Sequence, residues 1–210
     1  MSRLLSISHT LASRRMLLFL SFSALASIRS ARAESANPAV AIIQRFYDSL
    51  IELMKAAPQL SFDQRYDRFQ PVIKRTFDLG LMTRLAIGPT WTQLQPDQQQ
   101  RLEVAFTRYT IWVYVDQFKN YSGERFEVDP DPSANSNGVV VQTRLVKSNG
   151  EKVTLNYLVH QAAAGWQVMD VYLSGTISEL ATRRSEFAAV LRQDGADGLV
   201  RALEQRSSRQ

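Results

Sequence analysis

The stretch that decides the fold spans residues 165–195 and reads GWQVMDVYLSGTISELATRRSEFAAVLRQDG. Its first part alternates as a β-strand does, and both faces are largely apolar, so both should be covered by other elements. The alternation predicts Trp166, Val168 and Tyr172 on one face, and Met169 and Val171 on the other.

A helix is predicted directly after this strand. Gly175 ends the strand, Thr176 can cap the helix with Glu179, and Gly195 ends it. Its apolar stripe consists of Ile177, Leu180, Phe187 and Leu191.

Arg184 falls within this stripe, between Leu180 and Phe187. Its stem can pack while its charge reaches solvent or pairs with a carboxylate such as Asp170. Alternatively, Arg184 meets the polar head of a ligand or a partner protein.

Residues 1–33 have the features of an export signal peptide. Arg3, Arg14 and Arg15 precede the apolar run 16–28, and Ala31-Arg32-Ala33 has the small-x-small form of a cleavage site. Residues 13–18 also resemble a twin-arginine signal. We therefore expect a mature chain that begins near Glu34, forms one domain over 34–210 and has no transmembrane segment.

The net charge of +5 comes from this leader, which holds five arginines and no acidic residue. The remaining 20 basic residues equal the 20 acidic ones, so we expect no nucleic-acid partner. The chain has no cysteine, which excludes disulfides and thiolate metal sites.

Four helices are predicted before residue 121. Asn37 can cap a helix that Pro58 ends, and Ser61 with Gln64 forms a capping box for a second, which Pro71 should bend or split. Asp78 can cap a short third helix over 79–87, and the fourth runs from Pro96 to about Asn120.

Between Tyr109 and Phe118 the fourth helix is apolar or aromatic nearly all the way round. Such a helix either is buried in the centre of the core, or has one face on the core and another on an internal cavity. Central burial is the more common arrangement for bulky aromatic side chains.

The period changes to two after Gly123. Strands are predicted at 126–128, 139–146, 153–159 and 166–172, with turn residues between them, and a last helix at 199–204. Helices followed by strands indicate an α+β fold, here a curved antiparallel sheet of about four strands packed against N-terminal and C-terminal helices. Such a cone-like arrangement leaves an apolar pocket.

Few residues suit catalysis. His160 is the sole histidine after the leader and is expected to be an ordinary, partly exposed side chain. Asp170, among apolar neighbours, is the best candidate for a general base, although a charge pair with an arginine is the more common role. An isomerase or dehydratase that uses Asp170 with Tyr157 or Tyr172 is the enzyme alternative.

Several motifs together resemble the MlaC family of periplasmic lipid-shuttle proteins, also known as toluene-tolerance auxiliary components. They are Phe77-Asp78-Leu79, Leu81-Met82-x-Arg84-Leu85, Gly165-Trp166-x-Val168-x-Asp170-Val171, Arg184-Ser185-x-Phe187 and Asp197-Gly198-Leu199. The stretches 121–128 and 170–180 are similar to the HpnM subgroup, which is associated with hopanoids.

The resemblance implies a non-enzymatic carrier without cofactor or metal, which exchanges a hopanoid or phospholipid with a membrane-bound ABC transporter. Arg184 would contact the headgroup or a partner, although many phospholipid members have a tyrosine where this chain has Arg183. The expected pocket residues are Leu50, Leu81, Leu85, Ile111, Val115, Phe118, Val141, Leu145, Leu155, Tyr157, Val168 and Tyr172.

Overall fold

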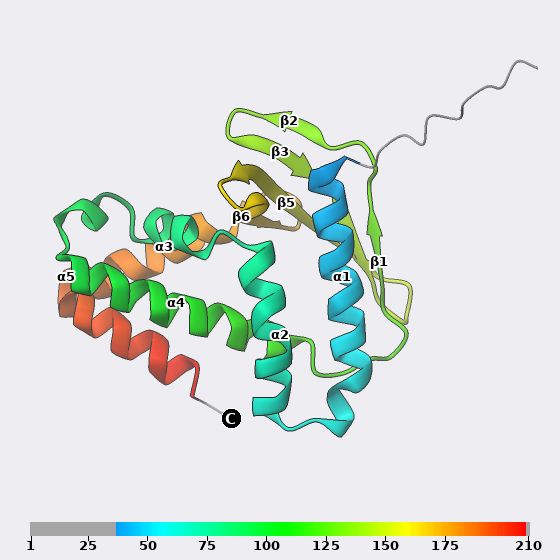
Figure 1. The fold of residues 1–210 in the computed structure, drawn as a ribbon, viewed down its shortest axis with the longest axis horizontal. Coiled ribbons are helices and arrows are strands. Elements are labelled where there is room, and N and C mark those ends of the chain that lie inside the picture. The colour runs from blue at the N-terminus through cyan, green and yellow to red at the C-terminus, as the bar shows by residue number, and fades with distance from the viewer. Residues whose placement is uncertain (1–36, 209–210) are drawn as a thin grey trace, which may run out of the picture. The chain divides into compact units, whose positions relative to one another are not determined.

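Four α-helices come first in the computed structural model, which describes residues 37–208 (Figure 1). They are α1 (Pro38–Ala56), α2 (Phe62–Thr76), α3 (Leu79–Ile87) and α4 (Pro96–Gln117). Short 3₁₀-helices, Ala57–Gln59 and Gly88–Gln93, follow α1 and α3.

Side chains fix where these helices begin. The Asn37 side chain accepts from the backbone of Ala39, and Ser61 and Gln64 form a reciprocal capping box. The Asp78 side chain accepts from the backbone of Leu81 at the start of α3. These starts confirm the predicted ones, but α2 continues through Pro71 without being split.

An antiparallel sheet of seven strands follows in the described part of the chain. The first pairings join β1 (Arg125–Val128) to β4 (Thr143–Val146), and β2 (Ser133–Asn135) to β3 (Gly138–Val141). β3 and β4 are one predicted strand interrupted at Gln142, and both pair with β5 (Lys152–Ala162). On its other side β5 pairs with β6 (Gly165–Leu173). The α+β class and the antiparallel sheet are confirmed, but the predicted number of about four strands was too low.

A β-bulge in β6 changes which residues face the helices. Val159 pairs with Val168 and Leu158 pairs with Asp170, so Met169 is the extra residue. Val168 and Val171 therefore share the inner face, and Tyr172 lies on the outer face. The predicted alternation was wrong after Val168 because a bulge inverts the side-chain parity.

The last helix, α5 (Glu179–Arg206), begins later than the sequence suggested. Ile177 and Ser178 form the short strand β7 beside β6, and the Ser178 side chain caps α5 by accepting from Ala181. Thr176 is therefore not the cap, and Ile177 is 55% exposed instead of buried in the helical stripe. Gly195, at φ 66°, kinks α5 where two helices were predicted.

The helices pack on the inner face of the sheet. α1 contacts β1, β3, β5 and β6, and α4 lies beside α2, α3 and α5 (Figure 1). Phe46 of α1 lies at the centre of the aromatic core, its ring 5.3 Å from that of Phe77, 5.5 Å from Tyr114 and 6.3 Å from Tyr157. Within residues 37–208, no helix combines the length and the apolar character that a membrane crossing requires.

Candidate functional site: an apolar cavity with an ionic rim

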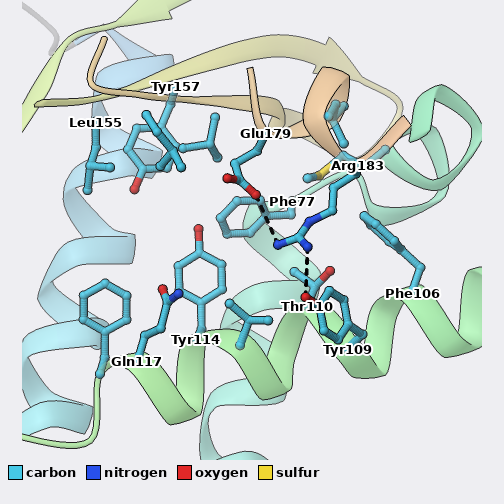
Figure 2. A pocket seen from close by; sticks show the side chains of 16 residues that line it. Phe77, Phe106, Tyr109, Thr110, Tyr114, Gln117, Leu155, Tyr157, Glu179 and Arg183 are labelled. Carbon is cyan, nitrogen blue, oxygen red and sulfur yellow. Dashed lines mark hydrogen bonds and ion pairs between the residues drawn. The ribbon is translucent and has the colours of Figure 1, made fainter. Parts of the chain in front are cut away.

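A cavity of about 180 Å³ lies between the sheet and helices α3, α4 and α5 (Figure 2). Its lining is mostly apolar and aromatic, with a few polar side chains. The lining residues are Phe77, Met82, Phe106, Tyr109, Thr110, Val113, Tyr114, Gln117, Phe118, Leu155, Tyr157, Val171, Leu173, Glu179, Leu180 and Arg183.

One face of α4 forms the longest wall. The lining positions 106, 109, 110, 113, 114 and 117 follow the spacing of a single helical face. Ile111 and Val115, which are fully buried, point away from the cavity into the core. Of the two arrangements that the aromatic run allowed, the structure has the second, with one face on the core and the other on a cavity.

β5 and β6 form the opposite wall. Leu155 pairs with Leu173 and Tyr157 pairs with Val171, so these four side chains lie on one face of the sheet. The bulge at Met169 brings Val171 and Leu173 onto this face, in place of Asp170 and Tyr172, which strict alternation from Val168 would put there.

The ionic side of the cavity is built by Arg183 on the first turns of α5. Its Nη2 lies 3.3 Å from Glu179 Oε2, and its Nη1 donates to the Tyr109 hydroxyl at 3.0 Å (Figure 2). The guanidinium also lies 5.1 Å from the centre of the Tyr109 ring. The side chains of Arg183 and Glu179 are 20% and 30% exposed, so this side of the cavity reaches solvent.

Tyrosine hydroxyl groups mark another part of the cavity. The hydroxyls of Tyr114 and Tyr157 point toward the same part of it (Figure 2), and the Tyr47 hydroxyl lies behind, 3.1 Å from that of Tyr157. Burial raises the pKa of Tyr47 to about 12, and burial also raises the pKa of Tyr114 and of Tyr157. These hydroxyls are therefore neutral at physiological pH.

Phe118, Leu155 and Tyr157 are the predicted pocket residues that line the cavity. Leu50 is buried on α1 in the hydrophobic core and does not line the cavity. The other predicted residues that do not line the cavity are buried or partly buried elsewhere: Leu81, Leu85, Ile111, Val115, Val141, Leu145, Val168 and Tyr172.

Arg184 does not contact the cavity. Its Nε donates to the carbonyl of Leu85 at 2.8 Å. Its Cδ lies 3.4 Å from the position that a Cβ atom would occupy if residue 88 were not glycine. It thus satisfies a carbonyl at the C-terminal end of α3. Its neighbour Arg183 lines the cavity instead. The spacing of the apolar stripe in this helix did not predict that exchange.

Asp170 is buried on the outer face of β6 and is not part of the cavity. Its carboxylate accepts from the backbone N–H of Val171 at 2.8 Å and of Leu180 at 3.2 Å, and from the Ser178 hydroxyl at 2.6 Å. None of these hydrogen bonds turns the carboxylate toward the cavity, and none of them involves Arg184. Asp170 instead fastens the start of α5 to the sheet.

His160 is partly buried, with its Nε2 3.1 Å from Asp78 Oδ2. It links β5 to the residue that caps α3 and does not line the cavity. In the part of the chain that the structure describes, no cluster of histidine and acidic side chains could hold a metal ion.

Proteins similar to this chain include a phospholipid-binding protein of known structure and a toluene tolerance protein. A structure of a phospholipid-binding protein from Ralstonia solanacearum, in complex with a phospholipid, is 28% identical and superposes with a TM-score of 0.71. The match covers 82% of this chain and 98% of that one. The toluene tolerance protein Ttg2D of Pseudomonas putida is 25% identical over 103 residues, which span 49% of this chain and only 47% of that relative.

The family comparison covers more of the chain. The model of the MlaC protein family matches residues 44–205, from α1 to the last turn of α5. All residues that line the cavity lie inside this range. The chain therefore belongs to the MlaC family.

Proposed function

We propose that this protein is a periplasmic lipid carrier that holds the apolar part of a lipid in the cavity between α4, α5 and the sheet. The observation that carries the proposal is the cavity itself, whose walls are mostly aromatic and aliphatic side chains. A similar chain of the same fold was crystallised with a phospholipid. The proposed lipid-contacting set therefore includes Phe118, Leu155 and Tyr157, together with Val113 of α4 and Val171 and Leu173 of β6.

A carrier of this kind has a clear physical purpose. A C16 acyl chain in water exposes about 16 methylenes at about 0.8 kcal/mol each, which amounts to about 13 kcal/mol. Unaided desorption from a membrane is correspondingly slow. A cavity that keeps the chain out of water removes most of this barrier.

The proposal extends to the ligand, the partners and the route. The lipid is a hopanoid or a phospholipid, the first because residues 121–128 and 170–180 resemble the HpnM subgroup. The partners are the membrane-bound components of an ABC-type transporter that maintains the outer membrane. Residues 1–33, which lie outside the described residues, act as an export signal, and residues 34–210 form one lipid-binding domain.

The enzyme alternative is not supported by the position of Asp170. An isomerase or dehydratase would need this carboxylate in the cavity beside the substrate. Instead, its oxygens accept hydrogen bonds from Val171, Ser178 and Leu180 on the outer side of β6.

The carrier function is tested by filling the cavity. Val113 lies on the cavity face of α4, and Val104 lies on the same helix but is 63% exposed. Protein purified from the periplasm, and protein stripped of lipid and incubated with phospholipid or hopanoid vesicles, would be compared by native mass spectrometry. We expect one lipid per chain in the wild type and in Val104→Trp, and at least a severalfold lower occupancy in Val113→Trp.

Circular dichroism would establish that both variants are folded. A wild type that carries no lipid from either source would contradict the carrier function. Equal lipid occupancy in folded Val113→Trp and Val104→Trp would show that lipid binds outside this cavity.

A further inference from the structure

We propose that the Arg183–Glu179 pair selects lipids whose polar head has no net charge, such as a zwitterionic phospholipid head or the hydroxyl group of an otherwise apolar lipid. The inference rests on the proposed carrier function and adds the class of headgroup. It depends on the charges and hydrogen-bonding groups at the rim of the cavity.

The rim carries charge of both signs. Arg183 Nη2 lies 3.3 Å from Glu179 Oε2, and Arg183 Nη1 lies 3.5 Å from Glu186 Oε2. Arg206 Nη1 lies 3.3 Å from the same Glu186 oxygen, from across the kink of α5. Two cations therefore face two carboxylates, and the cluster is neutral as a whole.

Arg183 and Glu179 both line the cavity, and their side chains are less exposed than those of Glu186 and Arg206. The side chains of Arg183 and Glu179 are 20% and 30% exposed, against 43% for Glu186 and 46% for Arg206. A lipid head at this rim would thus meet Arg183 and Glu179 together. An anionic head would be attracted by the arginine and repelled by the glutamate at similar distances.

The pair retains hydrogen-bonding capacity for a ligand. A guanidinium has five N–H donors. Within residues 37–208, Arg183 donates only through Nη1, to Tyr109 and Glu186, whereas its contact with Glu179 is an ion pair without hydrogen-bond geometry. The free donors suit a phosphate or hydroxyl oxygen, and the Glu179 carboxylate suits an ammonium or hydroxyl group.

The experiment is a competition within one membrane. Lipid-stripped protein is incubated with vesicles of equal parts dioleoyl phosphatidylethanolamine and dioleoyl phosphatidylglycerol, which share the same tails, and the bound lipid is identified by native mass spectrometry. The wild type should carry more phosphatidylethanolamine. Glu179→Gln leaves the cavity arginine unbalanced and should move the bound ratio toward phosphatidylglycerol by about threefold, the scale of a partly screened ion pair.

Glu186→Gln is the matched control, since it removes the same charge from the same arginine at a position that does not line the cavity. It should move the ratio less than Glu179→Gln. Arg183→Gln should move the ratio in the opposite direction, which keeps the test independent of the folding of any single variant. The double change Glu179→Arg with Arg183→Glu restores neutrality and should return the ratio toward that of the wild type.

A wild type that prefers phosphatidylglycerol, or equal shifts in Glu179→Gln and Glu186→Gln, would overturn the inference while leaving the carrier function intact. Absence of any bound lipid in the wild type and in all variants would instead contradict the carrier function, and the inference with it.

Discussion

Tyr47 joins α1 to the sheet through its hydroxyl group. This oxygen lies 2.6 Å from Thr143 Oγ1 and 3.1 Å from the Tyr157 hydroxyl, and the Thr143 hydroxyl donates to the carbonyl of Leu155. Tyr47 and Tyr157 are each 2% exposed. A small buried polar network thus joins α1 to the sheet. An unsatisfied hydroxyl group at this buried position would lower the stability of the fold.

Alkaline unfolding should report this network. Burial raises the pKa of Tyr47 from 10 to about 12, so between pH 10 and 12 the unfolded chain loses this proton while the folded chain keeps it. Linkage then requires the free energy of unfolding to fall in this window, by about 1.4 kcal/mol per pH unit for each such group. Below pH 10 the contribution of Tyr47 is fully present.

Tyr47→Phe should therefore reduce the slope of stability against pH between pH 10 and 12. It should also lower stability at pH 7 by about 1–2 kcal/mol, because Thr143 and Tyr157 lose a partner. Urea unfolding at a series of pH values measures both effects. Tyr121→Phe, at a 39% exposed position, is the control, and an unchanged slope in Tyr47→Phe would refute the assignment.

At the scale of elements, the junction of β6 and α5 depends on Asp170. Its carboxylate binds the backbone N–H groups of Val171 and Leu180 and the hydroxyl of Ser178. Ser178 in turn caps α5, on whose first turns Glu179 and Arg183 stand. The position of the ionic rim thus depends on a carboxylate on the other face of the sheet.

Asp170→Asn should lower the free energy of unfolding by about 1–3 kcal/mol, since an amide nitrogen would face a donor where an oxygen now accepts. Chemical denaturation measures this loss. Asp197→Asn is the control, because Asp197 forms an exposed ion pair with Arg101, and solvent screening leaves such a pair with little effect on stability. If Asp170 were a catalytic base, its replacement would abolish an activity and leave stability nearly unchanged, contrary to this expectation.

At the scale of the whole molecule, the cavity is small for its proposed ligand. Its volume of about 180 Å³ is below the range of about 300–1,000 Å³ that is usual for ligand sites. A complete acyl chain therefore requires the walls to separate. Among these walls, α5 is the helix with a kink, which lies at Gly195. Glu186 and Arg206 form an ion pair across this kink.

Loading with lipid should stabilise the whole chain. A ligand present at 100 times its dissociation constant adds about 2.7 kcal/mol to the free energy of unfolding, provided that it does not bind the unfolded state. Protein reloaded with dioleoyl phosphatidylethanolamine should thus unfold at a higher urea concentration than lipid-stripped protein. In Val113→Trp the two midpoints should coincide, and a shift as large as that of the wild type would argue against the cavity as the binding site.

The sequence alone determined where the first four helices begin and where the longer strands lie. Helix starts at Pro38, Phe62, Leu79 and Pro96 depend on capping groups within three residues, and the strands depend on a period of two, so both can be read from neighbouring residues. The order of helices and strands likewise led to the correct fold class.

Only the tertiary structure decided which apolar residues line the cavity, because a buried side chain against the core and one against a cavity have the same character in sequence. Phe118, Leu155 and Tyr157 could be found, whereas Val171 and Leu173 could not, since the bulge at Met169 arises from pairing with β5. The exchange of roles between Arg183 and Arg184 has a similar cause. Successive residues on a helix point about 100° apart, and the packing of α5 against α3 and α4 determines which of them faces the cavity.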